Sequence, residues 1–212
     1  MYNGNMINSK EPLLNLPPTT KLLLGILIAI HVGLMVVAPV EIRGWVIMNL
    51  SFIPQVIIAH DWNSAPFYPL TPLTHMLLHG SWLHLGMNCV MLLAFGSGIE
   101  RWIGGQKMLF IMVMSGLCGA ALHFALNIQS LSPMIGASGG LSGLFAAALI
   151  MMQRHNPHQS QYGIWPFVLL WVAISFVLGS MGGPDGSAVA WAAHIGGFLG
   201  GFLSLALLKK KA

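Results

Sequence analysis

Residues 136–152 read GASGGLSGLFAAALIMM, a stretch of small residues with two serines that passes into an unbroken apolar run. These 17 residues carry no charge, and an α-helix needs roughly 20 such residues to cross a hydrocarbon core of about 30 Å. The glycines around Ser138 allow a tight turn and a close backbone approach where the helix starts. The stretch therefore predicts a membrane helix with a serine at its beginning.

The rest of the chain has the same apolar character. Of its 212 residues, 56% are hydrophobic and 7% are charged, whereas a soluble domain carries about 25% charged residues. Five further apolar runs, bounded by charge, proline or glycine, are 22–40, 83–98, 108–128, 164–181 and 190–208. We predict an all-α polytopic membrane protein built as a bundle of six transmembrane helices, and a water-soluble globule is excluded.

The basic residues predict the orientation of this bundle in the membrane. Eight of them fall on one side of the predicted helices, and only Arg43 falls on the other. The positive-inside rule then places both termini in the cytoplasm. The predicted parts are a cytoplasmic segment 1–21, a membrane domain 22–208 and a basic tail 209–212. Because the basic residues form no continuous patch, we expect no nucleic-acid partner.

The first connection, 41–82, is the longest in the chain. Four prolines break any continuous span through it, and its remaining residues are rich in aromatic and aliphatic side chains. Such a mixture is typical of a segment lying in the interfacial layer of a membrane. We therefore expect neither a helix nor an ordinary loop here, but a segment embedded in the outer face of the membrane.

Polar groups inside a span cost free energy and are candidates for function. In the predicted second, fourth and sixth spans these groups are His84 with Asn88, Ser138 with Ser142, and His194. His84, Ser138 and His194 lie 16, 16 and 15 residues from the charged residue that ends their own helix. At a rise of 1.5 Å per residue, all three lie roughly 6 to 8 Å below the outer surface of the core. The sequence thus predicts one polar layer shared by three helices.

The residue types in this layer suit acyl transfer. Ser138 is the predicted nucleophile and His194 the base that accepts its proton. The free amides at a helix start, with His84 and Asn88 on one face of their helix, suit an oxyanion hole. All five acidic residues of the chain fall at helix ends or in connections, so a Ser-His dyad is expected rather than a triad.

Each of these groups also has a purely structural interpretation. Serine and glycine in membrane helices commonly serve close packing, and a single histidine can be a structural hydrogen-bonding group. Ser142, one turn beyond Ser138, is interpreted as a packing neighbour. His75 and His79 have the i, i+4 spacing of a zinc pair but lack the glutamate that zinc proteases place between them. We therefore predict no metal and no cofactor.

Four motifs together resemble the rhomboid family of intramembrane serine proteases. They are THMLLHGSWLHLGMN at residues 74–88, Glu100-Arg101, GASG at 136–139 and AHIGGFLGG at 193–201. The resemblance runs from about residue 22 to 208 and implies a six-helix protease that cleaves other proteins in or next to their transmembrane segments. It assigns Ser138 as nucleophile, His194 as general base, and His84, Asn88 and the Ser138 amide to the oxyanion hole. Gly136 and Ala137, which precede the serine, are included in the predicted oxyanion and substrate-binding set.

The chain departs from the family pattern at two places. Leu70 and Thr71 stand where many members have a Trp-Arg pair, so another device must hold the first connection. Ser142 stands where some members place a tyrosine against the base histidine, so the His194 ring needs another packing partner.

Partners and location follow from the resemblance. The expected partners are transmembrane protein substrates and the lipid bilayer, and the expected location is a bacterial inner membrane. The sequence does not predict the oligomeric state. A rhomboid-like protein that binds transmembrane clients without cutting them is the alternative function; loss of the serine or of the base histidine would indicate it, and both residues are present.

Overall fold

The computed structural model describes residues 15–59, 66–155, 162–182 and 190–209. Within these ranges the regular elements are helices. In addition, one isolated antiparallel bridge pairs Phe52 with Met134. The all-α prediction is confirmed for this part of the chain. Most of the predicted N-terminal segment and of the basic tail lies outside the described residues.

Six long helical stretches correspond to the six predicted apolar runs. They are α1 (Pro18–Val32) with the π-turn η1 (Gly33–Val37), the continuous series α5 (Trp82–Met91), η4 (Leu92–Gly96) and α6 (Ser97–Ile103), then α7 (Gly105–Leu126), α8 (Ser138–His155), α9 (Trp165–Met181) and α10 (Trp191–Lys209). α1 starts before the predicted Leu22 because proline is compatible with the first turn of a helix. The α5–α6 series continues past its predicted end at Gly98 to Ile103. It ends there because Gly104 has a φ of 87°, a conformation that favours glycine.

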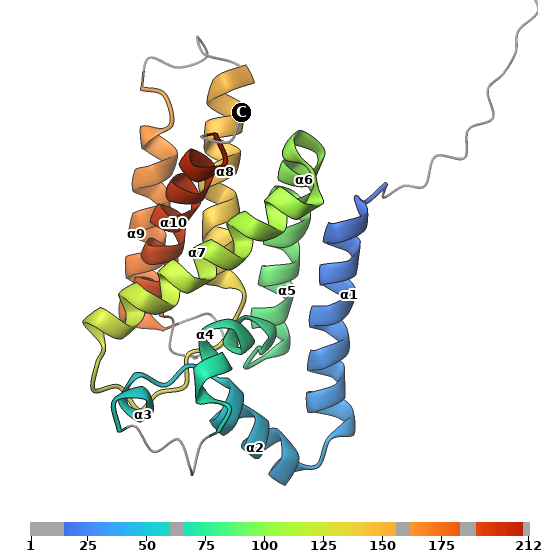
Figure 1. Ribbon diagram of the computed structural model, residues 1–212, viewed down its shortest axis with the longest axis vertical. Helices are drawn as coiled ribbons and strands as arrows, with labels where there is room; N and C mark the ends of the chain where they lie inside the picture. Colours follow the sequence, from blue (N-terminus) through green and yellow to red (C-terminus); the bar gives the residue numbers. More distant parts are fainter. Residues whose placement is uncertain (1–14, 60–65, 156–161, 183–189, 210–212) are drawn as a thin grey trace, which may run out of the picture.

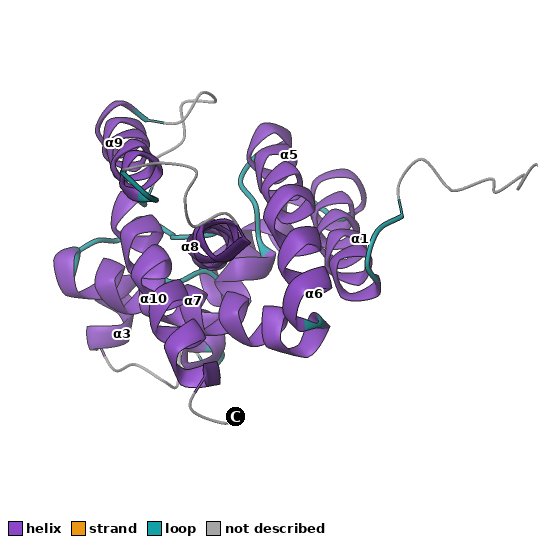
Figure 2. Cartoon of the chain, turned by 90° about the horizontal axis from the view of Figure 1, so that it is seen from above, coloured by secondary structure: helices purple, strands orange, loops and turns teal. Residues whose placement is uncertain are grey.

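Four of these stretches are long and apolar enough to cross a membrane by length and composition. They are Pro18–Val37, Trp82–Ile103, Gly105–Leu126 and Trp191–Leu208. α9 is apolar but shorter. α8 has ten buried residues among its 18, and Figure 2 shows it in the middle of the bundle. The chain is therefore an integral membrane protein in which α8 is a central helix.

Glycines bring α7, α8 and α10 into close contact. A Cβ at Gly119 of α7 would lie 2.6 Å from the carbonyl oxygen of Ala193. Cβ atoms at Gly197 and Gly201 of α10 would overlap the backbone of Gly139 and Gly143 of α8. Such small-residue contacts let helix backbones approach closely in a membrane. They fix the start of α8 against the start of α10.

A buried carboxylate ties α1 to the bundle. Glu100 of α6 accepts hydrogen bonds from the Thr19 amide at 2.8 Å, the Thr20 amide at 2.7 Å and the Thr20 hydroxyl at 2.8 Å. Amides in the first turn of a helix have no partner within that helix. Glu100 supplies that partner and sets the position of α1 beside α5 and α6.

The first connection contains more helix than predicted. Its elements are α2 (Val40–Leu50), α3 (Pro54–Ala59), η2 (Tyr68–Leu70), α4 (Thr71–Thr74) and η3 (His75–Leu77), and α2, α3 and α4 gather at the lower end of the bundle in Figure 1. The expectation of a non-helical segment is wrong for α2, because residues 40–50 run without proline between Pro39 and Pro54.

Side-chain hydrogen bonds to the backbone hold the first connection around Leu70 and Thr71. The Tyr68 hydroxyl donates to the Met48 carbonyl at 3.2 Å, and the Thr71 hydroxyl donates to the Tyr68 carbonyl at 2.8 Å. The Thr74 hydroxyl donates to the Leu50 carbonyl at 2.7 Å. Two threonines and a tyrosine thus link α2, η2 and α4.

Candidate active site

The segment before Ser138 is held by backbone bonds to the first connection. Phe52 and Met134 exchange N–H to carbonyl bonds at 3.0 and 2.9 Å, and the Gly136 amide donates to the His75 carbonyl at 2.9 Å. Gly136 has φ +118°, a conformation that favours glycine. This turn delivers the chain into α8 so that Ser138 is the first residue of the helix.

Ser138 and His194 meet at the starts of two helices. His194 lies in the first turn of α10, and its Nε2 atom is 2.9 Å from the Ser138 Oγ atom. The two residues are 56 positions apart in the sequence. The close α8–α10 packing brings together the hydroxyl and imidazole that the depth comparison placed at one level.

His84 and Asn88 approach the same point from α5. Ser81 caps this helix by accepting from the His84 amide at 3.1 Å. A Cβ at Gly136 would lie 2.7 Å from His84 Nε2 and 3.7 Å from Ser138 Oγ, so the His84 ring covers the glycine beside the serine. Asn88 is 2% exposed, and its Nδ2 donates to the His84 carbonyl at 2.8 Å. An amide nitrogen carries two hydrogens, and among the described residues this is the one bond that Nδ2 makes, so its second hydrogen can serve a ligand in the cavity that Asn88 lines.

A single cavity of about 610 Å³ joins these groups. Five of the six predicted site residues line it, namely His84, Asn88, Gly136, Ser138 and His194. Ala137 does not; its side chain is fully buried in the core, and its carbonyl accepts the Leu141 amide in the first turn of α8. Ala137 therefore contributes to the helix start rather than to the cavity wall.

Sequence reasoning missed Trp171 of α9. Its ring centroid lies 6.2 Å from that of His194, with the planes inclined by 41°, and it also lines the cavity. Trp171 thus provides the packing partner that the sequence left unidentified for the imidazole. No sequence motif surrounds Trp171. Its place beside His194 is visible only from the packing of α9 in the structure. His123 of α7 also lines the cavity and was not singled out.

Ser142 is engaged by its own helix. Its side chain is fully buried, and its hydroxyl donates to the Ser138 carbonyl at 2.7 Å. A serine hydroxyl that donates to the carbonyl four residues earlier already has a hydrogen-bond partner within its own helix. Its proton is then not directed to a base. The geometry agrees with the interpretation of Ser142 as a packing residue.

His75 and His79 occupy separate environments. His75 Nδ1 bonds the Thr71 carbonyl at 2.9 Å, and burial lowers the pKa of this histidine to about 4. The His79 ring lies 5.1 Å from His84 and 6.4 Å from His31 between centroids, and burial lowers its pKa to about 3. Both rings are neutral at pH 7. Within the described residues, no group of three or more potential metal ligands comes together.

Residues 68–211 match the rhomboid domain. The chain belongs to the rhomboid family. This rhomboid is 30% identical over 179 residues to the rhomboid protease AarA of Providencia stuartii, covering 73% of this chain and 59% of that protein. It is 29% identical over 137 residues to the rhomboid protease GluP of Bacillus subtilis, covering 64% of this chain and 25% of GluP.

A plant protein is also similar to this chain, over part of its own length. RHOMBOID-like protein 4 of Arabidopsis thaliana is 36% identical over 128 residues, which are 59% of this chain and 30% of that protein. This rhomboid therefore spans less than two thirds of the length of each of these three relatives. Ser138 and His194 both lie within residues 68–211, the part of this chain that matches the rhomboid domain.

Proposed function

We propose that this rhomboid is an intramembrane serine endopeptidase that cleaves membrane proteins in or next to their transmembrane segments through a Ser138–His194 dyad. The observation that carries the proposal is the 2.9 Å approach of His194 Nε2 to Ser138 Oγ. Two of the relatives described above are named rhomboid proteases. No metal or cofactor takes part in the proposed chemistry.

The first step is attack by the Ser138 hydroxyl on the scissile carbonyl. A serine hydroxyl is a weak nucleophile until a base takes its proton. Nε2 of His194 faces Oγ, so it accepts this proton when the ring carries its other hydrogen on Nδ1. The imidazolium then returns the proton to the leaving amine, and an acyl-enzyme on Ser138 remains.

The developing oxyanion requires donors fixed in advance. The Ser138 amide stands at the start of α8, where backbone amides and the helix dipole favour negative charge. Nδ2 of Asn88 and the imidazole of His84 line the same cavity. One such donor typically contributes a factor of about 10² to 10³ in rate.

Hydrolysis of the acyl-enzyme requires water inside the bundle. The cavity of about 610 Å³ has room for water beside the acyl group. His194 acts as the base again and removes a proton from this water. Ser138 is thereby regenerated, and the carboxylate product leaves.

The proposed membrane arrangement uses all six long stretches. The four candidate spans are joined by α9 and by α8, whose burial at the centre of the bundle compensates for its glycine-rich, less apolar composition. The membrane domain is 22–208, both termini face the cytoplasm, and the first connection lies in the opposite interface. We further propose a bacterial inner membrane as the location.

A reporter assay tests this function. The solubilised full chain is incubated with a single-span membrane protein, and cleavage is compared among wild type, Ser138→Ala, His194→Ala and Ser142→Ala. We expect Ser138→Ala and His194→Ala each to lower cleavage at least about a thousandfold. Ser142→Ala is the matched control and should cleave within severalfold of wild type.

The assay also distinguishes the other interpretations. Cleavage that survives Ser138→Ala but is lost in Ser142→Ala would move the nucleophile to Ser142. Cleavage that is abolished by chelators and unaffected by either serine change would indicate a metal enzyme. Retention of the reporter without any cleavage by wild type would favour the client-binding alternative.

A further inference from the structure

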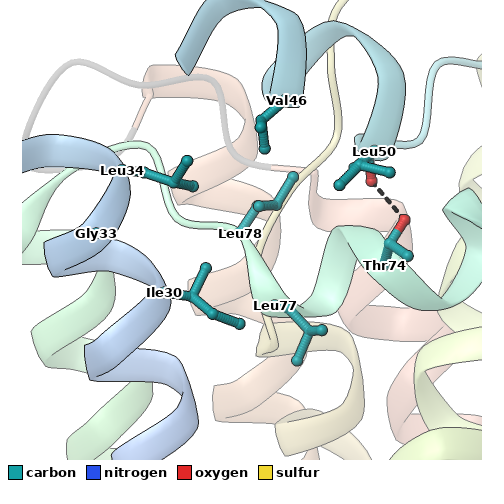
Figure 3. Close-up of a pocket in the computed structure, with 8 residues that line it drawn as sticks. All are labelled: Ile30, Gly33, Leu34, Val46, Leu50, Thr74, Leu77 and Leu78. Atoms are coloured by element: carbon teal, nitrogen blue, oxygen red, sulfur yellow. Dashed lines mark hydrogen bonds between the residues drawn. The ribbon is translucent and has the colours of Figure 1, made fainter. Parts of the chain in front are cut away.

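A second cavity, of about 340 Å³, lies between α1 and the first connection. Figure 3 shows its eight lining residues: Ile30, Gly33, Leu34, Val46, Leu50, Thr74, Leu77 and Leu78. None of them lines the cavity of Ser138 and His194. This apolar cleft is therefore separate from the candidate active site.

The walls of the apolar cleft offer nothing to bind water. Its lining is aliphatic except for Thr74, whose hydroxyl already donates to the Leu50 carbonyl. A site without free polar partners does not hold ordered water. In a protein surrounded by lipid, a hydrocarbon chain is the available filling. The volume lies at the lower end of the range typical for ligand pockets.

Arg43 supplies a positive charge on the same face of α2 as the apolar cleft. Arg43, Val46 and Leu50 are spaced i, i+3 and i+7 along the helix, so they share one side. The Arg43 Nη1 atom contacts the Met35 sulfur at 3.6 Å, and Met35 follows the cleft residue Leu34. The guanidinium thus lies between α2 and η1, next to the apolar lining.

The part of the chain that the structure describes gives this guanidinium no anionic partner. Among the described residues its hydrogen-bonding contact is a thioether sulfur, which is a weak acceptor, and no carboxylate forms an ion pair with it. Glu41, two residues earlier, lies on the far side of α2 because two residues turn a helix by about 200°. A partly buried guanidinium normally pairs with a carboxylate or phosphate, often through two parallel hydrogen bonds.

We propose that the apolar cleft binds a phospholipid, with one acyl chain between α1 and α2 and the phosphate on the Arg43 guanidinium. The lipid belongs to the leaflet on whose side the first connection lies. It would join two elements, α1 and α2, that otherwise face each other across an open cleft. The proposal does not depend on the proteolytic function.

Native mass spectrometry of the solubilised full chain tests this site with two lipids that have the same acyl chains. Dioleoylphosphatidylglycerol carries the phosphate, and dioleoylglycerol lacks it. We expect wild type to retain more of the phospholipid. Arg43→Gln should lower phospholipid retention about fivefold, which is the effect of one basic residue near an anionic lipid, and leave dioleoylglycerol retention unchanged.

Two matched pairs locate the lipid. Val46→Trp fills the apolar cleft and should lower retention of both lipids, whereas Val40→Trp, on an exposed part of the same helix, should not. Arg154→Gln removes an exposed cation at the end of α8 and should leave retention at the wild-type level. The hydrogen-bonding contact of Arg43 among the described residues is to a thioether, so Arg43→Gln keeps the test decisive if Val46→Trp does not fold.

Three results would overturn the proposal. They are equal retention of the two lipids by wild type, retention of the phospholipid that Arg43→Gln does not change, and an equal loss in Arg43→Gln and Arg154→Gln. Each would mean either that lipid binds nonspecifically around the protein or that the side chains of the apolar cleft pack together and leave no binding site. Because the readout is bound lipid, failure here and failure of the protease assay are distinguishable.

Discussion

At the scale of single residues, Gly136 connects the nucleophile segment to the predicted oxyanion hole. Its φ of +118° is rarely adopted by other residues, and the space of its missing side chain is occupied by the His84 ring. A side chain at this position would both strain the backbone and displace the His84 ring. Gly136 therefore allows both the backbone turn before Ser138 and the position of the His84 ring.

We predict that Gly136→Ala lowers protease activity about a hundredfold, because a displacement of roughly 1 Å in a catalytic group costs about that much. Reporter cleavage and far-UV circular dichroism measure activity and helix content. The control is Gly98→Ala in α6, where the new Cβ would lie at an ordinary 3.7 Å from the Met151 side chain. Equal activity in the two variants would contradict the role of Gly136.

The site residues differ in how far the sequence could predict them. Ser138, His194, His84 and Asn88 lie in predicted spans, where a polar group costs free energy and so suggests a function. The depth comparison groups Ser138, His194 and His84, and the i, i+4 spacing adds Asn88. Trp171 has no such signal, because an aromatic residue in an apolar helix is ordinary. Ala137 was included for its place beside Ser138, yet the turn before α8 directs its side chain into the core.

At the scale of elements, the attachment of α1 depends on Glu100. Three donors from Thr19 and Thr20 converge on this one carboxylate. Hydrogen bonds to a charged group contribute about 1.5 to 3 kcal/mol each when buried. Loss of the charge leaves the amides of the first turn of α1 with a weaker acceptor.

We therefore expect Glu100→Gln to lower the free energy of unfolding by about 2 kcal/mol. Equilibrium unfolding of the solubilised protein in a denaturing detergent measures this change. Glu41→Gln makes the same substitution in the first turn of α2, at an exposed position, and should lower the free energy of unfolding by less than about 1 kcal/mol. If the two variants unfold alike, Glu100 does not anchor α1.

The α8–α10 contact depends on glycine. We predict that Gly197→Ala lowers the free energy of unfolding by about 1 to 3 kcal/mol, because its Cβ would overlap the backbone of Gly139. Gly25→Ala, with no atom within 4 Å of the new Cβ, should instead be neutral or slightly stabilising. Thermal unfolding of both variants measures the difference, and a stabilising Gly197→Ala would refute this packing.

The elements themselves follow largely from apolar runs and their boundaries. The sequence predicts where the six long stretches lie because membrane helices are uniformly apolar. It does not predict α2, since prolines on both sides of a short run indicate irregular structure as readily as a short helix. The threonine and tyrosine bonds of the first connection depend on contacts between segments, which periodicity does not encode.

At the scale of the whole molecule, the distribution of charge predicts how the bundle sits in the membrane. With the two native cysteines changed to alanine, Glu41→Cys and Arg154→Cys introduce single thiols at exposed positions. A membrane-impermeant maleimide applied to intact cells should label Glu41→Cys, and label Arg154→Cys only after permeabilisation. The opposite pattern would reverse the orientation.

The central claim is that the Ser138 hydroxyl is activated by His194 inside the bundle. A fluorophosphonate probe reacts with such a serine, and mass spectrometry of the labelled protein identifies the modified residue. We predict one adduct, on Ser138 in the wild type, and none in His194→Ala although that variant keeps the serine. An adduct on another residue, or equal labelling of Ser138 without His194, would contradict the account.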